Sequence, residues 1–292
     1  MRATVAFNRP LSPAYLHLGI AAPGFPATFR AGEFVMVRPA WTGDPFLPRA
    51  FSIYRITTRP PAAGASTPVV EILYKVLGKG TQCLARMEPG QEVEILGPLG
   101  NFFTVPEDLK QIILVAGGIG VPPIAALGTQ LSQTGNWKLE TGNLVAFLGG
   151  KTHEDILCVK DFEEAGASVH ITTEDASLGT RGLITDPLRA FLLTPTQPTG
   201  GTQRSRWVRP KVGWVPAFPL AIYACGPPAM LAAVAKLAGE FGVPCQISVE
   251  ANMACGFGAC MGCAIEVTGE AKRYKLVCKD GPIFDSREIV WR

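Results

Sequence analysis

The chain has 292 residues, which at about 150 residues per domain predicts two domains, or three if one is small. Hydrophobic residues make up 47% of the sequence and charged residues 17%, a composition that excludes a disordered chain, a collagen and a coiled coil. The formal net charge of +3 is too close to balance to indicate a partner that is a nucleic acid. With 32 glycines and 25 prolines, the sequence predicts a globular protein with many tight turns.

Two long uncharged runs, residues 111–137 and 212–235, exceed the roughly 20 residues that a membrane-spanning helix needs. Each is interrupted near its middle, by a proline pair at 122–123 and by Gly-Pro-Pro at 226–228. Prolines at mid-span remove helical hydrogen bonds where no water can replace them. Both runs therefore predict a buried parallel strand, a tight loop and a helix. Because the N-terminus lacks the apolar stretch of a signal peptide, we expect a soluble, cytoplasmic chain without a membrane partner.

The pattern of strands and helices predicts an α+β multidomain fold in three parts. Residues 1–104 predict an antiparallel β-barrel, because short strands alternate with Gly/Pro turns. Residues 105–242 predict an α/β domain with a parallel sheet, whose strand ends commonly bind nucleotides. Residues 243–292 form a small C-terminal domain that needs a metal centre or its neighbour to fold. The predicted strands are Phe34–Arg38, Ala50–Ile56, Val69–Val76, Glu92–Leu96, Gln111–Ala116, Leu144–Leu148, Ala167–Thr172 and Leu220–Ala224. The predicted helices are Pro122–Gln133, Glu154–Ala165 and Pro227–Phe241.

Four of the eight cysteines fall in the last 40 residues. Clustered thiols in a chain without a secretion signal favour a metal over disulfides. The pattern is C-x4-C-x2-C followed by a distant fourth cysteine, the spacing of plant-type 2Fe–2S proteins. The predicted metal ligands are Cys255, Cys260, Cys263 and Cys278.

Glycines between these cysteines suit a loop that curls round a negatively charged cluster. Gly256, Gly258 and Gly262 permit positive φ angles and a close approach of backbone N–H groups to the sulfurs. The alternatives are a structural zinc site and unliganded buried thiols. Zinc sites usually show paired short spacings, and here only Cys260 and Cys263 form such a pair.

Two motifs in residues 1–104 indicate a flavin and its pyrophosphate. The run Arg49–Ser52 (RAFS) on a predicted strand can place a cation near a pyrophosphate and a hydroxyl near a flavin ring. Phe and Ser are also ordinary strand residues, so this motif alone is weak. After Leu73–Lys75 comes Gly78–Thr81 (GKGT), whose N–H groups at a helix start resemble an anion nest, with a simple glycine turn as the alternative.

Two strand-to-helix turns favour a dinucleotide phosphate. Gly117–Gly120 follows an apolar strand and precedes a helix with prolines in its first turn. This turn is not G-x-G-x-x-G, so the standard fingerprint does not apply. Cys225–Pro228 follows the strand Leu220–Ala224, and two turns at one edge of a parallel sheet indicate a nucleotide site more specifically than either alone. Cys225 is either an inert buried thiol or a residue beside the nicotinamide.

Taken in order, these motifs resemble a known family. RAFS, GKGT, GPLGN (Gly97–Asn101), GGIGVPP, CGPPAM and the cysteine tail closely resemble the electron-transfer subunits of bacterial class 1B dihydroorotate dehydrogenase, within the ferredoxin–NADP reductase superfamily. The resemblance covers nearly the whole chain and is strongest at residues 250–263 and 277–284. Thr173–Gly179 resembles the family's acidic loop near the pyridine nucleotide.

The resemblance implies a role for each matching residue. The expected FAD-binding residues are Arg49, Ala50, Phe51 and Ser52 at the flavin and ribityl-phosphate, Leu73, Tyr74 and Lys75 along FAD, and Gly80 and Thr81 at the pyrophosphate. The residues expected to receive NAD(H) are Gly117, Gly118, Gly120, Cys225, Gly226 and Pro227. Hydride transfer to a flavin needs no general acid or base, so no catalytic residue is assigned with certainty, although Ser52 and Cys225 are expected near the flavin and the nicotinamide. His17, His153 and His170 are interpreted as ordinary surface or core residues.

The sequence departs from the family at a few positions. Ala50 replaces a proline, Phe102 follows Gly-Asn where the family has glycine, and Ala176 replaces a glycine in the acidic loop. Segments near 60–68 and 195–215 are insertions, the second interpreted as an exposed, solvated loop.

The implied function is electron transfer from dihydroorotate to NAD+ in de novo pyrimidine (UMP) biosynthesis. Electrons are expected to run from the FMN of a catalytic dihydroorotate dehydrogenase subunit through the 2Fe–2S cluster and FAD, in an α2β2 heterotetramer. Alone, the chain is expected to be an NADH-dependent flavin/iron–sulfur reductase. The alternatives are the reductase subunit of a bifurcating transhydrogenase or sulfhydrogenase, and a non-enzymatic, zinc-stapled binding module.

Overall fold

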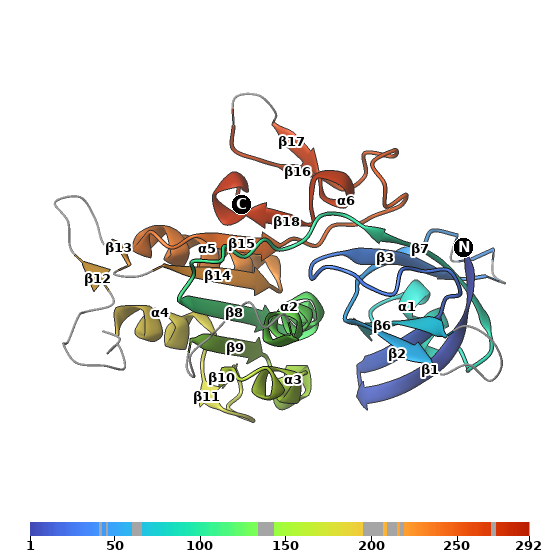
Figure 1. Ribbon diagram of the computed structural model, residues 1–292, viewed down its shortest axis with the longest axis horizontal. Coiled ribbons are helices and arrows are strands. Elements are labelled where there is room, and N and C mark those ends of the chain that lie inside the picture. The colour runs from blue at the N-terminus through green and yellow to red at the C-terminus, as the bar shows by residue number, and fades with distance from the viewer. Residues whose placement is uncertain are drawn as a thin grey trace. The chain divides into compact units, whose positions relative to one another are not determined.

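The computed structural model describes residues 1–40, 43–44, 46–59, 66–133, 143–194, 207–208, 215–216, 219–269 and 273–291 (Figure 1). Its backbone contacts divide the chain into two compact units. Unit 1 contains Met1–Phe102, Glu250–Val267 and Ala271–Ile283, and unit 2 contains Phe103–Val249, Thr268–Glu270 and Phe284–Arg292. The C-terminal segment thus contributes to both units. The three-part division at residues 104 and 242 stays a prediction.

Unit 1 is built on a seven-stranded antiparallel sheet in the order β4-β3-β7-β1-β2-β6-β5. Its strands are β1 (Arg2–Ser12), β2 (Tyr15–Ala21), β3 (Phe34–Pro39), β4 (Arg49–Ser52), β5 (Arg55–Arg59), β6 (Thr67–Lys75) and β7 (Glu92–Leu99). Inward-facing side chains such as Val35, Ile72 and Ile95 form the core, and the short helix α1 (Lys79–Ala85) adds Leu84 to it. The predicted antiparallel barrel is confirmed.

The prediction of one strand over Ala50–Ile56 was wrong, because the chain changes edges within it. β4 and β5 are the two edge strands of the sheet, yet only Ile53 and Tyr54 separate them. Two residues span about 7 Å at most, so the sheet must curl until its edges lie side by side. The backbone N–H of Ile53 donates to Glu33 O and that of Tyr54 donates to Glu71 O, so these two residues bond to both edges in turn.

Unit 2 is built on a sheet in the order β11-β10-β9-β8-β14-β15-β18, parallel from β11 to β15. Its strands are β8 (Gln111–Gly117), β9 (Leu144–Gly150), β10 (Ser168–Thr173), β11 (Thr180–Arg181), β14 (Leu220–Cys225), β15 (Cys245–Ser248) and β18 (Ile283–Asp285). Its helices are η1 (Gly118–Gly120), α2 (Val121–Gln133), η2 (His153–Asp155), α3 (Val159–Glu164), α4 (Thr185–Leu193), α5 (Pro228–Phe241) and η3 (Ser286–Glu288). The predicted parallel α/β sheet is confirmed.

The strand order places a topological switch point between β8 and β14. From β8 the chain moves outward through β9 and β10, whereas from β14 it moves the other way to β15. Right-handed crossovers then put α2 and α3 on one face and α5 on the other, and α2 packs beside α3 while α5 packs beside α4 (Figure 1). At such a point the connections after the two central strands lead to opposite faces of the sheet, and α/β proteins bind ligands there, outside the carboxyl ends of the strands.

The predicted helix over Glu154–Ala165 is interrupted in the structure. A turn of 3₁₀ helix, η2, ends at Asp155, and α3 begins only at Val159. Cys158, the residue before α3, has a φ of 60°, which an α-helix cannot contain.

Two strand pairs lie outside the main sheets, β12 (Trp207–Val208) with β13 (Val215–Pro216), and β16 (Ala264–Glu266) with β17 (Tyr274–Leu276). The second pair leads into α6 (Val277–Asp280). Most of the predicted insertions near 60–68 and 195–215 lie outside the described residues. Among the helices of the described ranges, none has the length and apolar character that crossing a membrane requires.

Candidate functional site

The four cysteines of the C-terminal segment lie in unit 1 and form two pairs. In one pair the sulfurs of Cys263 and Cys278 are 3.2 Å apart, and the backbone N–H of Val277 donates to Cys263 O at 3.1 Å. In the other, the backbone N–H of Cys260 donates to Cys255 Sγ at 3.4 Å. β16 and β17 fix the first pair, since Cys263 directly precedes one strand and Cys278 follows the other within α6.

This two-by-two arrangement fits a two-iron centre, in which each iron takes two of the four thiolates. Within the described ranges, no three His, Cys, Asp or Glu side chains converge in the way a single metal ion needs. A zinc site would need all four thiolates to face one ion, whereas a two-iron centre needs two pairs.

Backbone N–H groups around the sulfurs provide the electrostatic environment that a negatively charged cluster needs. Burial opposes ionisation of Cys255, but N–H groups of Cys260, Phe257 and Ala259 outweigh it and lower the pKa of this thiol to about 6. At Cys278, desolvation and the adjacent Cys263 thiol raise the pKa to about 12. Two thiols this close cannot both ionise cheaply without a cation between them, which is what iron would supply.

The loop reaches this geometry through left-handed residues, though one is not the predicted glycine. Gly256 and Gly258 have φ angles of 82° and 89°, as the sequence predicts. Gly262 does not adopt a positive φ, and Met261 does so instead, at 61°. Gly262 serves by close approach, because its N–H donates to Cys260 Sγ at 3.5 Å.

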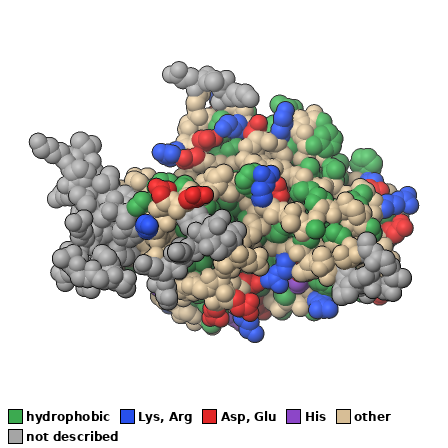
Figure 2. Space-filling view, viewed as in Figure 1, with side chains coloured by type: hydrophobic (Ala, Val, Ile, Leu, Met, Phe, Trp, Pro, Cys, Tyr) green, Lys and Arg blue, Asp and Glu red, His purple; other side chains and the backbone are tan. Residues whose placement is uncertain are grey.

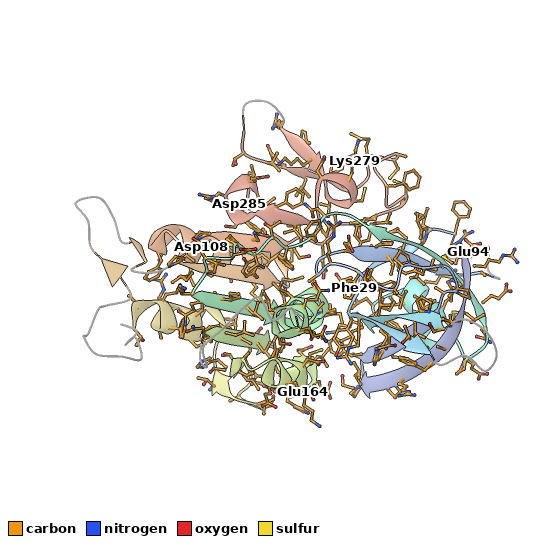
Figure 3. The ribbon with its side chains drawn as sticks, viewed as in Figure 1. Phe29, Glu94, Asp108, Glu164, Lys279 and Asp285 are labelled. Carbon is orange, nitrogen blue, oxygen red and sulfur yellow. The ribbon has the colours of Figure 1, made fainter. Side chains whose placement is uncertain are left out.

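The cysteine loop packs on the barrel of unit 1. A Cβ atom on Gly256 would lie 2.5 Å from Met36 Cγ of β3 and 3.2 Å from Leu99 Cδ1 of β7. Cys263 and Cys278 are buried, whereas Cys260 is exposed. Lys279, labelled in Figure 3, extends from α6 and packs its methylenes near Gly258. One side of the cysteine cage is therefore covered by protein and the other is open to solvent.

The residues expected to hold FAD are partly brought together within unit 1. Arg49 lies against the start of α1, where a Cβ on Gly80 would be 2.9 Å from the guanidinium Nε. The Thr81 hydroxyl is engaged in its own turn, because it accepts from the N–H groups of Leu77 and Gly78 at 2.9 and 3.1 Å. The cation and the glycine turn thus meet at one place, as a pyrophosphate site requires, while Thr81 rigidifies the turn.

The other residues expected to bind FAD lie on different faces of the barrel sheet. Phe51 packs edge-on to Tyr74, with ring centroids 5.8 Å apart. Burial raises the pKa of Tyr74 to about 12, and its hydroxyl donates to Asn8 Oδ1 at 3.2 Å. Lys75 points to the opposite face of β6 and donates to the Tyr15 hydroxyl at 2.9 Å. Leu73 shares the face of Lys75, while Ala50 and Ser52 lie half-buried on β4. The structure does not bring all these side chains to one surface.

The two turns expected to receive NAD(H) are in direct contact within unit 2. A Cβ on Gly120 would lie 2.5 Å from the Gly226 N and 2.6 Å from the Cys225 O. A Cβ on Gly117 would lie 2.9 Å from Pro227 Cδ. Gly118 has a φ of 51°. The glycines therefore permit the close packing of the turns after β8 and β14, at the switch point of the sheet. Cys225 is buried in the second turn.

The acidic loop after β10 is held by its own side chains. Asp175 Oδ1 accepts from the hydroxyl and the N–H of Ser177 at 2.6 and 2.9 Å, bonds that lower the pKa of this carboxyl. Ser177 Oγ in turn accepts from the His153 N–H at 2.7 Å. Ala176 between them has a φ of 65°, a left-handed conformation that favours glycine.

Comparisons with known proteins match both the cysteine segment and the chain as a whole. A family model described as the iron-sulfur cluster binding domain of dihydroorotate dehydrogenase B matches residues 250–290. A relative from Geobacillus kaustophilus, named dihydroorotate dehydrogenase B (NAD(+)), electron transfer subunit, is 35% identical over 99% of this chain and 98% of its own length. A relative of the same name from Desulforamulus reducens is 31% identical over 96% of this chain and 94% of its own.

Solved structures share the fold at lower identity. An NADH-dependent reduced ferredoxin-NADP oxidoreductase has a TM-score of 0.75 at 24% identity, covering 99% of this chain and 90% of its own. A ferredoxin NADP+ reductase from Neisseria gonorrhoeae, with bound FAD and NADP, has a TM-score of 0.60 at 17% identity, covering 83% of this chain and 91% of its own. These likenesses show a ferredoxin-reductase-like fold.

Proposed function

This chain belongs to the electron transfer subunits of dihydroorotate dehydrogenase B (NAD(+)), an oxidoreductase, and from that membership we propose the route and the residues of its electron transfer. The route runs from the FMN of a catalytic partner subunit through a 2Fe–2S centre and FAD to NAD+. The relatives' name favours this assignment over a transhydrogenase or sulfhydrogenase subunit. FAD is inferred from the RAFS and GKGT motifs and from the reductase-like fold that a FAD-bound reductase shares.

The observation that carries the proposal is the paired cysteine cage on the barrel of unit 1. Cys255, Cys260, Cys263 and Cys278 would hold the cluster, and the surrounding N–H groups would offset its negative charge. When bound, FAD would supply the conversion between the hydride of NADH and the single electrons of an iron–sulfur centre. Arg49 beside Gly80 would hold the anionic pyrophosphate, and the turns Gly117–Gly120 and Cys225–Pro227 would receive NAD(H).

The exposed side of the cysteine cage is the position that we favour for docking of the catalytic subunit. Cys260 is exposed, and its neighbours Phe257 and Met261 leave 59% and 62% of their surface accessible. Exposed large apolar residues next to a redox centre are typical of a docking surface. The catalytic subunit would cover this rim and receive or deliver electrons over a short path, in an α2β2 assembly. No disulfide joins the cysteines of the described residues, which favours a reducing compartment such as the cytoplasm.

The first experiment is the visible spectrum of the chain purified without oxygen, followed by titration with NADH. Flavin bands with an iron–sulfur shoulder, bleached by NADH, are expected. A colourless protein would contradict the proposal and favour a zinc-stapled module. Addition of dihydroorotate to the isolated chain is the control, because this substrate should leave the spectrum unchanged without the catalytic subunit.

A further inference from the structure

The segment after α6 is tied to the end of β7 by one side chain, Asn101. The Asn101 backbone N–H donates to Gly281 O at 2.7 Å, and its Nδ2 donates to Asp280 O at 3.1 Å and to Ile283 O at 2.8 Å. Its Oδ1 accepts from the Ile283 N–H at 2.8 Å. Both functional groups of the amide are therefore used on a segment about 180 residues away in sequence.

The surroundings of Asn101 are packed so that this contact has little room to shift. A Cβ on Gly100 would lie 2.6 Å from Pro282 Cδ and 2.9 Å from Gly281 O. On the other side, a Cβ on Gly32 would lie 2.9 Å from Ile283 Cγ1. Side-chain substitution at either glycine would push the segment away from the barrel.

Phe102, the residue after Asn101, is held in place by a cation–π contact. The Arg30 guanidinium lies 3.4 Å from the centroid of the Phe102 ring. Glu33, which is buried, orients that guanidinium by accepting from Arg30 Nε at 3.2 Å and Nη2 at 3.0 Å. A cation over the ring face holds the backbone beside Asn101 in place.

The segment that Asn101 holds begins directly after a proposed cluster ligand. Cys278 is two residues before Asp280, whose carbonyl accepts from Asn101 and whose Oδ2 accepts from the Leu276 N–H at 2.7 Å. Asp280 therefore links Asn101 to both ends of α6. Displacement of Asp280 would shift α6 and strain the contact in which the Cys278 N–H donates to Cys263 Sγ at 3.4 Å, so the spacing of these two ligands would change.

We propose that Asn101 is a positioning residue for the iron–sulfur centre, which fixes the Cys278 segment on the barrel through its hydrogen bonds to Asp280 and Ile283. The proposal rests on the proposed function, since it takes Cys278 as a cluster ligand. Outer residues that orient metal ligands typically contribute 10- to 100-fold to metal retention.

The test measures how fast a chelator removes iron from the full-length, cluster-loaded chain and from its variants. Loss of visible absorbance reports the release. Asn101→Ala is expected to release iron about tenfold faster than the unmodified chain. The control is Asn8→Ala, which removes another amide side chain of the same barrel. This amide makes a similar number of hydrogen bonds, to Leu84 O, Met87 O and the Tyr74 hydroxyl. Asn8→Ala should lower the thermal midpoint without faster iron release.

A second variant covers the case in which Asn101→Ala does not fold. Asn101→Asp has nearly the same volume and keeps the acceptor for the Ile283 N–H, but sets an oxygen against the carbonyls of Asp280 and Ile283. It should fold, release iron faster and change the electron paramagnetic resonance line shape of the dithionite-reduced cluster. Iron release equal to that of the unmodified chain in the variants that fold, or equal acceleration in Asn8→Ala, would overturn the proposal. An unmodified chain without any cluster would instead overturn the proposed function.

Discussion

Ala176 occupies a backbone conformation that suits glycine. Its φ of 65° lies in the left-handed region, where a Cβ atom is crowded by the following carbonyl. Ala176→Gly should therefore raise stability by about 0.5–1 kcal/mol, the relief of strain exceeding the added freedom of the unfolded chain. The measurement is the thermal midpoint. Gly179→Ala in the same loop should lower the midpoint, because its φ is 70° and its Cβ would also lie 2.2 Å from the Ile171 O. A lower midpoint for Ala176→Gly would show that the loop is not strained.

Glu71 makes stability depend on pH. Burial raises the pKa of this carboxyl, but hydrogen bonds from His17 and Thr57 outweigh burial, so the pKa lies below 4.5. A carboxyl with a depressed folded pKa stabilises the fold above its unfolded pKa, and this contribution disappears as the pH falls through the folded value. Glu71→Gln should therefore be less stable than the unmodified chain at pH 7.

The difference in unfolding free energy between the two proteins should narrow as the pH falls below about 4.5, where the carboxyl of the unfolded chain takes up a proton, and disappear below the lower pKa of the folded state. Denaturant titrations at pH 7 and at a series of lower values would measure it. The exposed carboxylate variant Glu107→Gln serves as control. A difference that stays constant down the pH series would exclude the ionised carboxylate as its source.

At the scale of elements, the contact between the turns after β8 and β14 leaves no room for a side chain at Gly120. Gly120→Ala would place a methyl group 2.5 Å from the Gly226 N, and overpacking of this kind costs about 1–3 kcal/mol. We expect the Kd for NADH to rise at least about tenfold, equivalent to about 1.4 kcal/mol, while the cluster spectrum is retained.

The measurement is a titration of flavin bleaching with NADH. Gly128→Ala in α2 is the control, because its Cβ would make an ordinary 3.4 Å contact with Leu114 Cδ1. Unchanged NADH affinity in Gly120→Ala would mean that nucleotide binding does not depend on how these two turns pack.

The elements that sequence reasoning located are those with strong local patterns. β8 and β14 are buried along their whole length and appear in the sequence as uninterrupted apolar runs. β1 was missed because its central and final residues are mostly exposed or half-exposed, and it includes Pro10. The separation of β4 from β5 was also missed, since it depends on how the whole sheet curls.

The candidate site, like the fold, could be predicted from the sequence only where the signal is local. Spacing alone predicted the four cysteines as metal ligands, and the structure brings them together in two pairs. Spacing could not show that Asn101 holds the segment after α6 or that Met36 packs against the cysteine loop, because these contacts join segments about 180 or more residues apart. The left-handed Met261 was also missed, since methionine carries no local signal for that conformation.

At the scale of the whole chain, the cysteine segment combines a buried side with an apolar, exposed rim. Figure 2 shows exposed hydrophobic side chains on the visible face, and Phe257 and Met261 are among the exposed large apolar residues of unit 1. Exposure of this apolar surface to water is unfavourable in free energy, and a partner that covers it would remove that penalty.

Phe257→Asp should therefore weaken binding of the catalytic subunit at least about tenfold, because a charge replaces an apolar side chain on the rim that the subunit is proposed to cover. Binding would be measured by calorimetry with the purified subunit, after the visible spectrum has shown that the cluster is intact. Leu183→Asp, at an equally exposed position (59%) in unit 2, is the control and should bind normally. Equal affinity for both variants would place the interface elsewhere.

The long reach of Asn101 also has a consequence for how the protein is made. The ribosome completes the barrel strands early, but Asp280, which Asn101 binds, follows 179 residues later. At about 5–20 residues per second, this delay is on the order of ten seconds or more. During that interval Met36 and Leu99 lack the loop that covers them. Iron delivery must therefore follow translation of nearly the entire chain, and a nascent protein stalled before its last 40 residues would present an uncovered barrel to chaperones.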